Sequence, residues 1–181
     1  MQGDRDIPAW LVCEDIFNKI KTELITQAME TLQDAIDSRA IEVNGSLVTL
    51  PDKPSDTDMK MFIINRIMED KDGIAERYRE YLSEKGTSDP KKVQQVERLK
   101  KFLLAIEQIS MLMSYSKLFD EWMHDIAMQV TAKEPQDAIT ATLKGNETRM
   151  EVLAYVLGNA KIGSEEILTE SERSILEKSI R

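Results

Sequence analysis

The apolar residues of the first forty positions recur at steps of three and four, which is the spacing of one face of an α-helix. Pro8 suits the first turn of such a helix, because the backbone N–H that proline lacks would have no partner there. The pattern predicts a long helix from about Pro8 to Ser38. The stripe that defines its apolar face consists of Trp10, Cys13, Phe17, Ile20, Leu24, Ala28, Leu32 and Ala35.

A different pattern follows in residues 41–50, where apolar residues flank the dipeptide Asn44-Gly45. Asn-Gly is a strong signal for a two-residue hairpin turn, because a type I′ turn needs positive φ at both central residues. The sequence therefore predicts a small β-hairpin at about 41–50. A lone hairpin is marginal in water, so this one must lie on helices or pair with another chain.

Helical spacing returns after Pro54 and continues toward Gly86, which stands where a helix C-terminal glycine is expected. The tetrapeptide Asp70-Lys71-Asp72-Gly73 interrupts this segment and predicts a kink or a break. The same tetrapeptide resembles part of a calcium-binding loop. The twelfth position of such a loop would be Arg79 rather than glutamate, so we do not expect calcium binding.

The longest uninterrupted pattern begins at Ser88-Asp89-Pro90, an N-cap candidate followed by a proline near the first turn. No proline or glycine occurs from there to about Ala132, which predicts a helix of up to ~65 Å. Two apolar stripes run along it, so we expect a central helix covered by other helices or by a second subunit. The stripes are Phe102, Ile109, Leu112, Phe119, Met123, Ile126 and Val130, and Val96, Leu99, Leu103, Ile106 and Met113.

The remaining residues predict three shorter helices. The first follows Pro135 and ends near Gly145, and the second begins at about Asn146. The last begins at Thr169, because Thr169 and Glu172 have the spacing of a capping box, in which each side chain binds the other residue's backbone N–H.

These elements define an all-α fold, a multi-helix bundle with a long central helix and one small β-hairpin at about 41–50. We expect residues 1–134 to form a helical core domain that carries the hairpin as an insertion. Residues 135–181 would form a C-terminal helical subdomain packed on it. The 181 residues also suit one single domain.

Composition favours a reducing compartment and a soluble chain. Cys13 is the single cysteine, so no disulfide can form within the chain. Residues 1–6 lack the basic start of a signal peptide. No uncharged stretch approaches the ~20 residues that a membrane span needs. We therefore expect no membrane partner and a cytoplasmic location, in a cell or in an infected host.

The formal net charge is −9, and the first half of the chain carries most of it. Such a surface repels phosphate backbones, so a nucleic-acid partner is disfavoured. The basic cluster Lys91–Lys101 contains five basic residues interleaved with Glu97 and apolar residues. This pattern is typical of a solvated helix face, and the alternative is a patch for phosphate or for an acidic partner.

The residues of the common catalytic chemistries are missing. His124 is the only histidine, so the spacing Glu121-x-x-His124 cannot be repeated to complete a di-metal site. The glycines are too scattered for a phosphate-binding loop. Acidic neighbours at Glu14 and Asp15 disfavour a reactive Cys13 thiolate. We therefore expect no catalytic residue, no cofactor and no metal.

The ten methionines and two tryptophans are consistent with either an ordinary core or an adaptable protein interface. We accordingly expect a non-enzymatic helical protein–protein interaction protein: an adaptor, an assembly factor or an inhibitor, whose small size and acidity also fit a phage-encoded factor. The alternatives are a nucleic-acid-linked regulator or acidic DNA mimic, and an enzyme with an unrecognised carboxylate site. The residues expected to bind a protein partner or a second copy are Trp10, Phe17, Met111, Leu112, Phe119 and Trp122.

The sequence predicts that aspartate at two of the positions Met111, Leu112, Phe119 and Trp122 dissociates a complex while helix content is kept. Burying one such side chain contributes about 1.5–3 kcal/mol. Light scattering and circular dichroism measure the two effects. Loss of the whole fold in these variants would instead identify the residues as intramolecular core.

Overall fold

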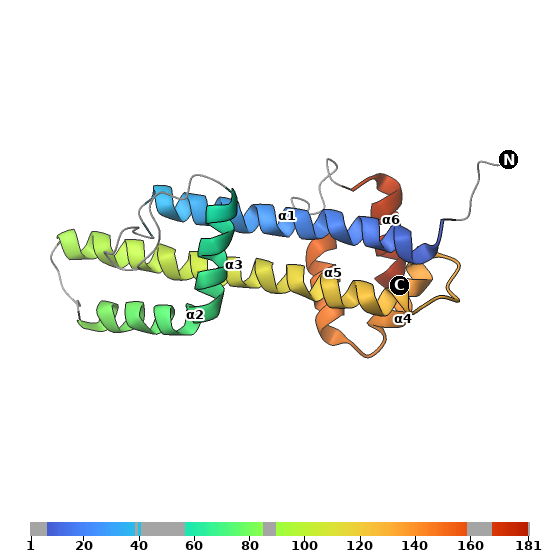
Figure 1. Cartoon of the computed structure of the whole chain (residues 1–181). Coiled ribbons are helices and arrows are strands. Elements are labelled where there is room, and N and C mark those ends of the chain that lie inside the picture. The colour runs from blue at the N-terminus through green and yellow to red at the C-terminus, as the bar shows by residue number, and fades with distance from the viewer. Residues whose placement is uncertain (1–6, 39, 41–56, 85–89, 159–167, 181) are drawn as a thin grey trace. The chain divides into compact units, whose positions relative to one another are not determined.

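A computed structural model describes residues 7–38, 40, 57–84, 90–158 and 168–180. Nearly all of these residues are helical and none lies in a strand, which confirms the all-α prediction (Figure 1). The predicted hairpin at 41–50 lies outside the described residues and stays a prediction. The helices are α1 (Ala9–Asp37), α2 (Thr57–Glu84), α3 (Pro90–Ala127), α4 (Pro135–Leu143), α5 (Glu147–Gly158) and α6 (Glu170–Ile180).

The two longest predicted helices form close to their expected limits. The first, α1, begins one residue after Pro8, whose carbonyl accepts the backbone N–H of Leu11 at 3.0 Å. The longest, α3, has 38 residues and begins at Pro90 as expected, but it ends at Ala127 rather than near Ala132. Met128 and Val130, beyond that end, are 69% and 79% exposed. Because these side chains are exposed, a further helical turn would gain little stabilisation from burying them.

The predicted interruption of α2 is confirmed as a kink at Asp70, whose φ of −122° and ψ of 24° leave the helical region. Figure 1 shows the two halves of α2 running in different directions on either side of it. Gly73 lies close against the Asp70 side chain, since a Cβ at position 73 would be 2.5 Å from Oδ1 of Asp70. The absence of a side chain at position 73 thus lets the Asp70 carboxylate fold back over the kink.

The chain forms two compact units, and α1 and α3 contribute residues to both. One unit contains residues 1–25 and 114–181, and the other contains residues 26–113. Spatial grouping does not measure independent folding, so the expected division into residues 1–134 and 135–181 stays a prediction. The two units are called the terminal unit and the middle unit below.

Three buried aromatic rings form the centre of the terminal unit. Phe17 of α1 meets Phe119 of α3 edge to face at 4.8 Å between ring centroids, and its ring lies 4.9 Å from that of Trp122. Phe119 and Trp122 stack at 5.5 Å. Such pairs add about 0.5–1.5 kcal/mol each beyond the burial of their area. This aromatic cluster therefore fixes α1 against α3 within the unit.

The core of the middle unit draws on both predicted stripes of α3. Phe102, Ile109 and Leu112 of the first stripe and Leu99 and Ile106 of the second are at most 3% exposed. Side chains of α1 and α2 complete this interior, namely Ala28, Leu32, Ala35, Ile63, Ile64, Ile67 and Ile74. The doubly apolar character of α3 is thus satisfied here largely by the chain itself.

Replacing Phe119 by alanine should lower the free energy of unfolding by about 3–5 kcal/mol, because the change leaves a cavity inside the aromatic cluster. Urea unfolding followed by tryptophan fluorescence measures the loss. Leu11→Ala is the control, since Leu11 is 41% exposed and should change stability much less. A loss below about 1 kcal/mol in Phe119→Ala would contradict a central role for this cluster.

Candidate functional site: an apolar groove formed by α4, α5 and α6

The turn between α4 and α5 is set by three consecutive residues. Lys144 ends α4 in an extended conformation, and Gly145 adopts a φ of 78°, which glycine reaches without the strain of a Cβ. Asn146 then caps α5, because its Oδ1 accepts the backbone N–H of Arg149 at 3.1 Å. The predicted boundary between the two helices at Gly145 and Asn146 is therefore confirmed.

Arg149 and Trp122 hold this helix pair against α3. The Trp122 indole N–H donates to the hydroxyl of Thr142, which is buried in α4. The Arg149 guanidinium donates to the Thr142 carbonyl at 3.1 Å and to the Asp125 carboxylate, and it lies 5.7 Å from the Trp122 ring centroid. The guanidinium binds a helix-end carbonyl, a carboxylate and an aromatic face at once. It therefore fixes the orientation of α5 as well as its position.

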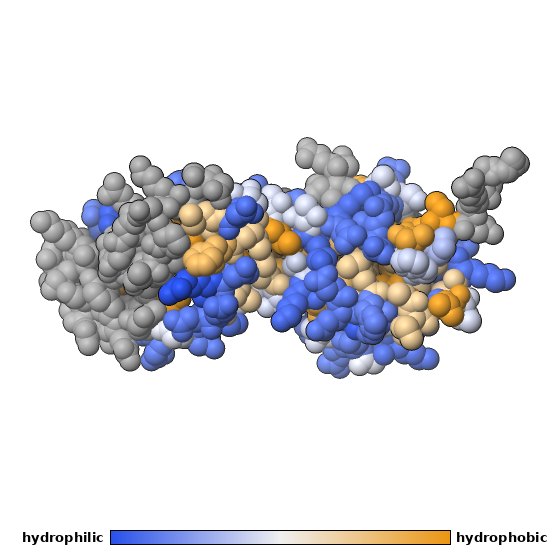
Figure 2. All heavy atoms as spheres, in the orientation of Figure 1, coloured by the Kyte–Doolittle hydropathy of each residue, from blue (hydrophilic) through white to orange (hydrophobic). Residues whose placement is uncertain are grey.

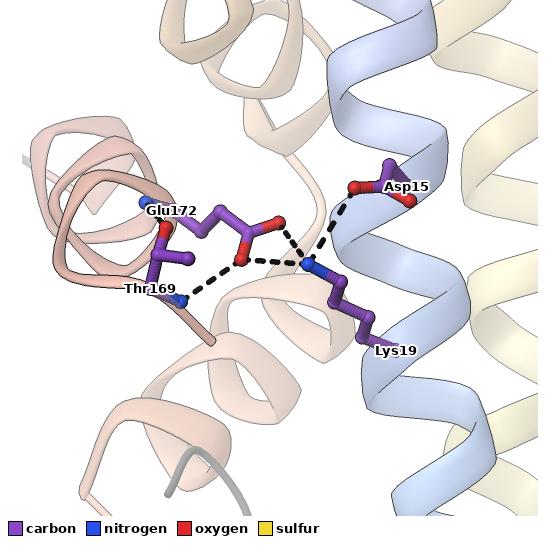
Figure 3. Close-up of polar contacts among 4 residues, drawn as sticks. All are labelled: Asp15, Lys19, Thr169 and Glu172. Atoms are coloured by element: carbon purple, nitrogen blue, oxygen red, sulfur yellow. Dashed lines mark hydrogen bonds and ion pairs between the residues drawn. The ribbon is translucent and has the colours of Figure 1, made fainter. Parts of the chain in front are cut away.

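The predicted capping box of α6 is confirmed. The Thr169 backbone N–H donates to Oε1 of Glu172 at 2.9 Å, and the Glu172 N–H donates to the Thr169 hydroxyl at 3.1 Å. Figure 3 shows that Lys19 of α1 reaches the same carboxylate, with its Nζ 2.9 Å from both oxygens and 3.6 Å from Asp15. One carboxylate thus caps α6 and ties it to α1.

These contacts shift two pKa values in opposite directions. Burial would raise the pKa of Glu172, but the Thr169 N–H and the Lys19 ammonium together outweigh it and hold that pKa below its ordinary value. The hydrogen bond to Glu172, opposed by some desolvation and assisted by the charge of Asp15, raises the pKa of Lys19. The pair is therefore ionised throughout the neutral range.

The three short helices leave an apolar groove between them, with a volume of about 830 Å³. Its floor includes the buried residues Leu143 and Ser179, and the Thr140 hydroxyl joins α4 to α6 by donating to the Ser179 carbonyl at 3.2 Å. Met150 and Ile180 are 48% and 44% exposed. The lining residues are Asp137, Thr140, Ala141, Leu143, Lys144, Gly145, Met150, Glu151, Ala154, Ser179 and Ile180.

Charged side chains mark the two ends of the groove along α4. Asp137 and Lys144, both exposed, stand seven residues apart on the face that also carries Thr140 and Ala141. Seven residues of helix span about 10.5 Å. Glu151 adds a second carboxylate from α5. Figure 2 shows hydrophobic patches bordered by hydrophilic surface on one face of the described residues.

The hydroxyls and the apolar walls of the groove bear on what it can do chemically. Its hydroxyls are engaged with helix backbone: Thr140 donates to the Gln136 carbonyl at 2.6 Å, and Ser179 donates to the Ile175 carbonyl at 2.8 Å. An activated hydroxyl needs an adjacent base instead. Mostly apolar walls with charges at the ends provide burial and orientation, which are the two requirements of a docking surface.

Four of the six residues expected to bind a partner are buried within the chain. Phe17, Leu112, Phe119 and Trp122 are each 0% exposed, so they belong to the core and offer no area to a partner. Their burial within a single copy is what the intramolecular alternative expects. Trp10 is 37% exposed near the start of α1, and Met111 is half-buried in the middle unit.

The remaining candidates for chemistry have structural surroundings. Burial raises the pKa of the Cys13 thiol to about 12, and a hydrogen bond with the backbone of Cys13 itself opposes the rise only in part. The thiol donates to the Pro135 carbonyl at 3.4 Å. Glu121 and His124 are exposed on α3. Across the described ranges no three side chains of the histidine, cysteine or carboxylate type lie together as a metal site. Lys100, of the basic cluster, pairs at 3.7 Å with Glu97 on the exposed face of α3.

A second, smaller cavity of about 300 Å³ lies between α2 and α3 in the middle unit. In its wall the Lys71 ammonium donates to the Ser110 hydroxyl at 2.9 Å. A serine–lysine pair can act as a nucleophile and base, but Ser110 lies inside a helix whose N–H groups are committed to intrahelical bonds. No free backbone donors are then available to stabilise an oxyanion. We therefore interpret the pair as a packing contact.

The groove residues were not among those expected from the sequence. Met150 and Ile180 are apolar positions in two of the three short helices that the sequence predicts. A hydrophobic period identifies an apolar helix face but not whether a neighbour covers it. The one local signal is that apolar Met150 is followed by charged Glu151, as at the edge of an amphipathic face.

Comparisons of this chain with protein-family models, with curated proteins and with solved structures found no match. Among the helices described, none is both long and apolar enough to cross a membrane.

Replacing Glu172 by glutamine should destabilise the protein at neutral pH, because glutamine keeps the shape but removes the charge that binds Lys19. The depressed pKa of Glu172 stabilises the fold above the ordinary carboxyl pKa, and this contribution is lost as the pH falls through the folded value. The difference between the wild type and Glu172→Gln should therefore shrink on acidification. Urea unfolding at a series of pH values measures it.

Thr169→Ala is the companion variant, because it removes the capping hydroxyl without changing a charge. It should cost about 1 kcal/mol, largely independent of pH. A Glu172→Gln difference that stays constant from neutral to acid pH would show that the charge on Glu172 does not stabilise α6.

Proposed function

We propose that this chain is a non-enzymatic protein–protein interaction protein, an adaptor, assembly factor or inhibitor, whose apolar groove between α4, α5 and α6 receives an amphipathic helix of a protein partner. The groove carries the proposal, because it combines an apolar lining with exposed Met150 and Ile180. Amphipathic helices commonly dock their apolar face into such grooves through side chains one turn apart.

The size of the groove suits this occupant. A volume of about 830 Å³ is larger than one side chain needs and accommodates the apolar residues of two successive helical turns. The exposed lining residues Ala141 and Ala154 have short side chains, so a partner backbone can approach α4 and α5 closely. Met150 has an adaptable thioether that fits irregular apolar surfaces.

The charges at the ends specify the partner further. Asp137 at the start of α4 favours a basic residue there, and Lys144 at the other end favours an acidic one. These exposed charges contribute orientation and specificity more than affinity. A nucleic acid is a weaker proposal for the same surface, because Asp137 and Glu151 repel phosphate. With its lone cysteine buried, the chain suits the reducing environment of a cytoplasm.

Photo-cross-linking from the groove tests this function. A benzophenone side chain introduced at Ala154 should cross-link to a protein when the chain is irradiated in the cell that makes it. Adding Met150→Asp should lower the yield about tenfold or more, because about 1.5–3 kcal/mol of apolar burial is lost and 1.4 kcal/mol is tenfold in affinity. Mass spectrometry of the cross-linked peptide identifies the segment that lies in the groove.

Met128→Asp is the matched control, since Met128 is 69% exposed and does not line the groove. It should leave the cross-link unchanged. Equal yields in the presence and absence of Met150→Asp would refute the groove as a protein-binding site, and so would a cross-link to lipid or nucleic acid alone.

A further inference from the structure

The structure points to the partner of this groove, and the inference rests on the proposed function. We propose that the groove receives a helix face of a second copy of this chain, the face of α3 centred on Leu104. This face consists of Lys100, Lys101, Leu104 and Glu107, and is called the Leu104 face below. The assembly joins the terminal unit of one copy to the middle unit of the next.

Leu104 is 65% exposed, the highest value among the large apolar side chains whose burial the structure describes on the six helices. Its neighbours Leu103 and Ala105 are half-buried and buried. Of these three residues only Leu104 projects away from the covered side of α3. Lys100 and Lys101 lie one turn before it and Glu107 lies one turn after it, all of them exposed. Residues three and four apart share one face of a helix, so the leucine is flanked by positive charge on one side and negative charge on the other.

The charges of the Leu104 face and of the groove match in sign and in spacing. Lys144 directly follows α4 and lies seven residues after Asp137, and Lys100 and Glu107 are seven residues apart on α3. Seven residues of helix span about 10.5 Å, so the two pairs of charges have similar separations. When α3 of one copy lies parallel to α4 of the other, Lys100 meets Asp137 and Glu107 meets Lys144, with Leu104 over the apolar centre of the groove.

The remaining charges are consistent with this register. Lys101 stands beside Lys100, and Glu151 supplies the groove with a second carboxylate. Lys100 lies 3.7 Å from Glu97 within its own helix, and the two side chains are 62% and 61% exposed. Exposed pairs of this kind contribute little, so Lys100 can exchange Glu97 for Asp137 at small cost.

The groove and the Leu104 face are different surfaces, and each copy carries one of each. The contact is therefore heterologous, and assembly through it either closes, at two copies or as a larger ring, or continues as an open chain.

Complementation between two full-length variants tests the proposal. Leu104→Asp removes the Leu104 face but keeps the groove, and Met150→Asp removes the groove but keeps the Leu104 face. In sedimentation velocity the wild type should assemble with increasing concentration. Each variant alone should stay a monomer at concentrations where the wild type assembles, because the Kd of self-association is raised about tenfold or more. An equimolar mixture of the two variants should form a dimer and nothing larger, because it retains one working contact.

Leu11→Asp and Met128→Asp are the matched controls, because they place the same charge on exposed apolar residues of neither surface. Both should assemble like the wild type. The double reversal Asp137→Lys with Lys144→Asp should prevent assembly, and mixing it with Lys100→Glu/Glu107→Lys should restore dimers. Circular dichroism should be unchanged in every variant, since each altered side chain is exposed.

Either of two results would overturn the inference: a wild type that stays monomeric at the highest attainable concentration, or a mixture of Leu104→Asp and Met150→Asp that stays monomeric while the wild type assembles. Neither result touches the proposed function, which depends on the cross-link from Ala154. If that cross-link joins the groove to a different protein, the second copy is not the occupant and the groove is still a protein-binding site. Absence of any protein cross-link would remove both proposals.

Discussion

The packing of Phe17, Phe119 and Trp122 is the interaction on which the terminal unit depends. The three rings join α1 to α3, and the indole N–H of Trp122 continues the connection into α4 through Thr142. Arg149 extends it to α5 by lying against the Trp122 ring while it binds the Thr142 carbonyl. A buried aromatic cluster with its one polar atom satisfied provides both burial and a fixed orientation. The positions of the short helices, and hence the groove, follow from it.

The groove exists because three short helices cannot cover one another completely. Buried faces of α4, α5 and α6 meet in the interior, where Ile139, Val152 and Leu176 are fully or nearly fully buried. The opposite side keeps small side chains on α4 and α5 and leaves Met150 and Ile180 partly in water. The tie between Lys19 and Glu172 holds α6 at its start. A surface that is apolar, open and held from behind is preorganised, which is the property that the proposed binding function would require.

Local features of the fold could be predicted from sequence because they depend on residues a few positions apart. The kink at Asp70, the turn at Gly145 and Asn146, and the capping box of Thr169 and Glu172 each involve at most four neighbouring residues. The sequence predicted an unreactive Cys13 from its acidic neighbours, but its raised pKa is caused by burial, which the neighbouring residues do not determine. The end of α3 was placed too late, because Val130 continues the apolar stripe without being covered.

By itself the sequence determined the helices, most of their limits and the apolar faces, because backbone hydrogen bonding and side-chain period act within one segment. Only the tertiary structure decided which apolar residues face inward. Phe17, Leu112, Phe119 and Trp122 looked like candidates for a partner surface and became core, while Met150, Ile180 and Leu104 remained in water. The physical reason is that the burial of a helix face depends on the elements that pack against it. Those elements are distant in sequence, and no pattern within one helix records them.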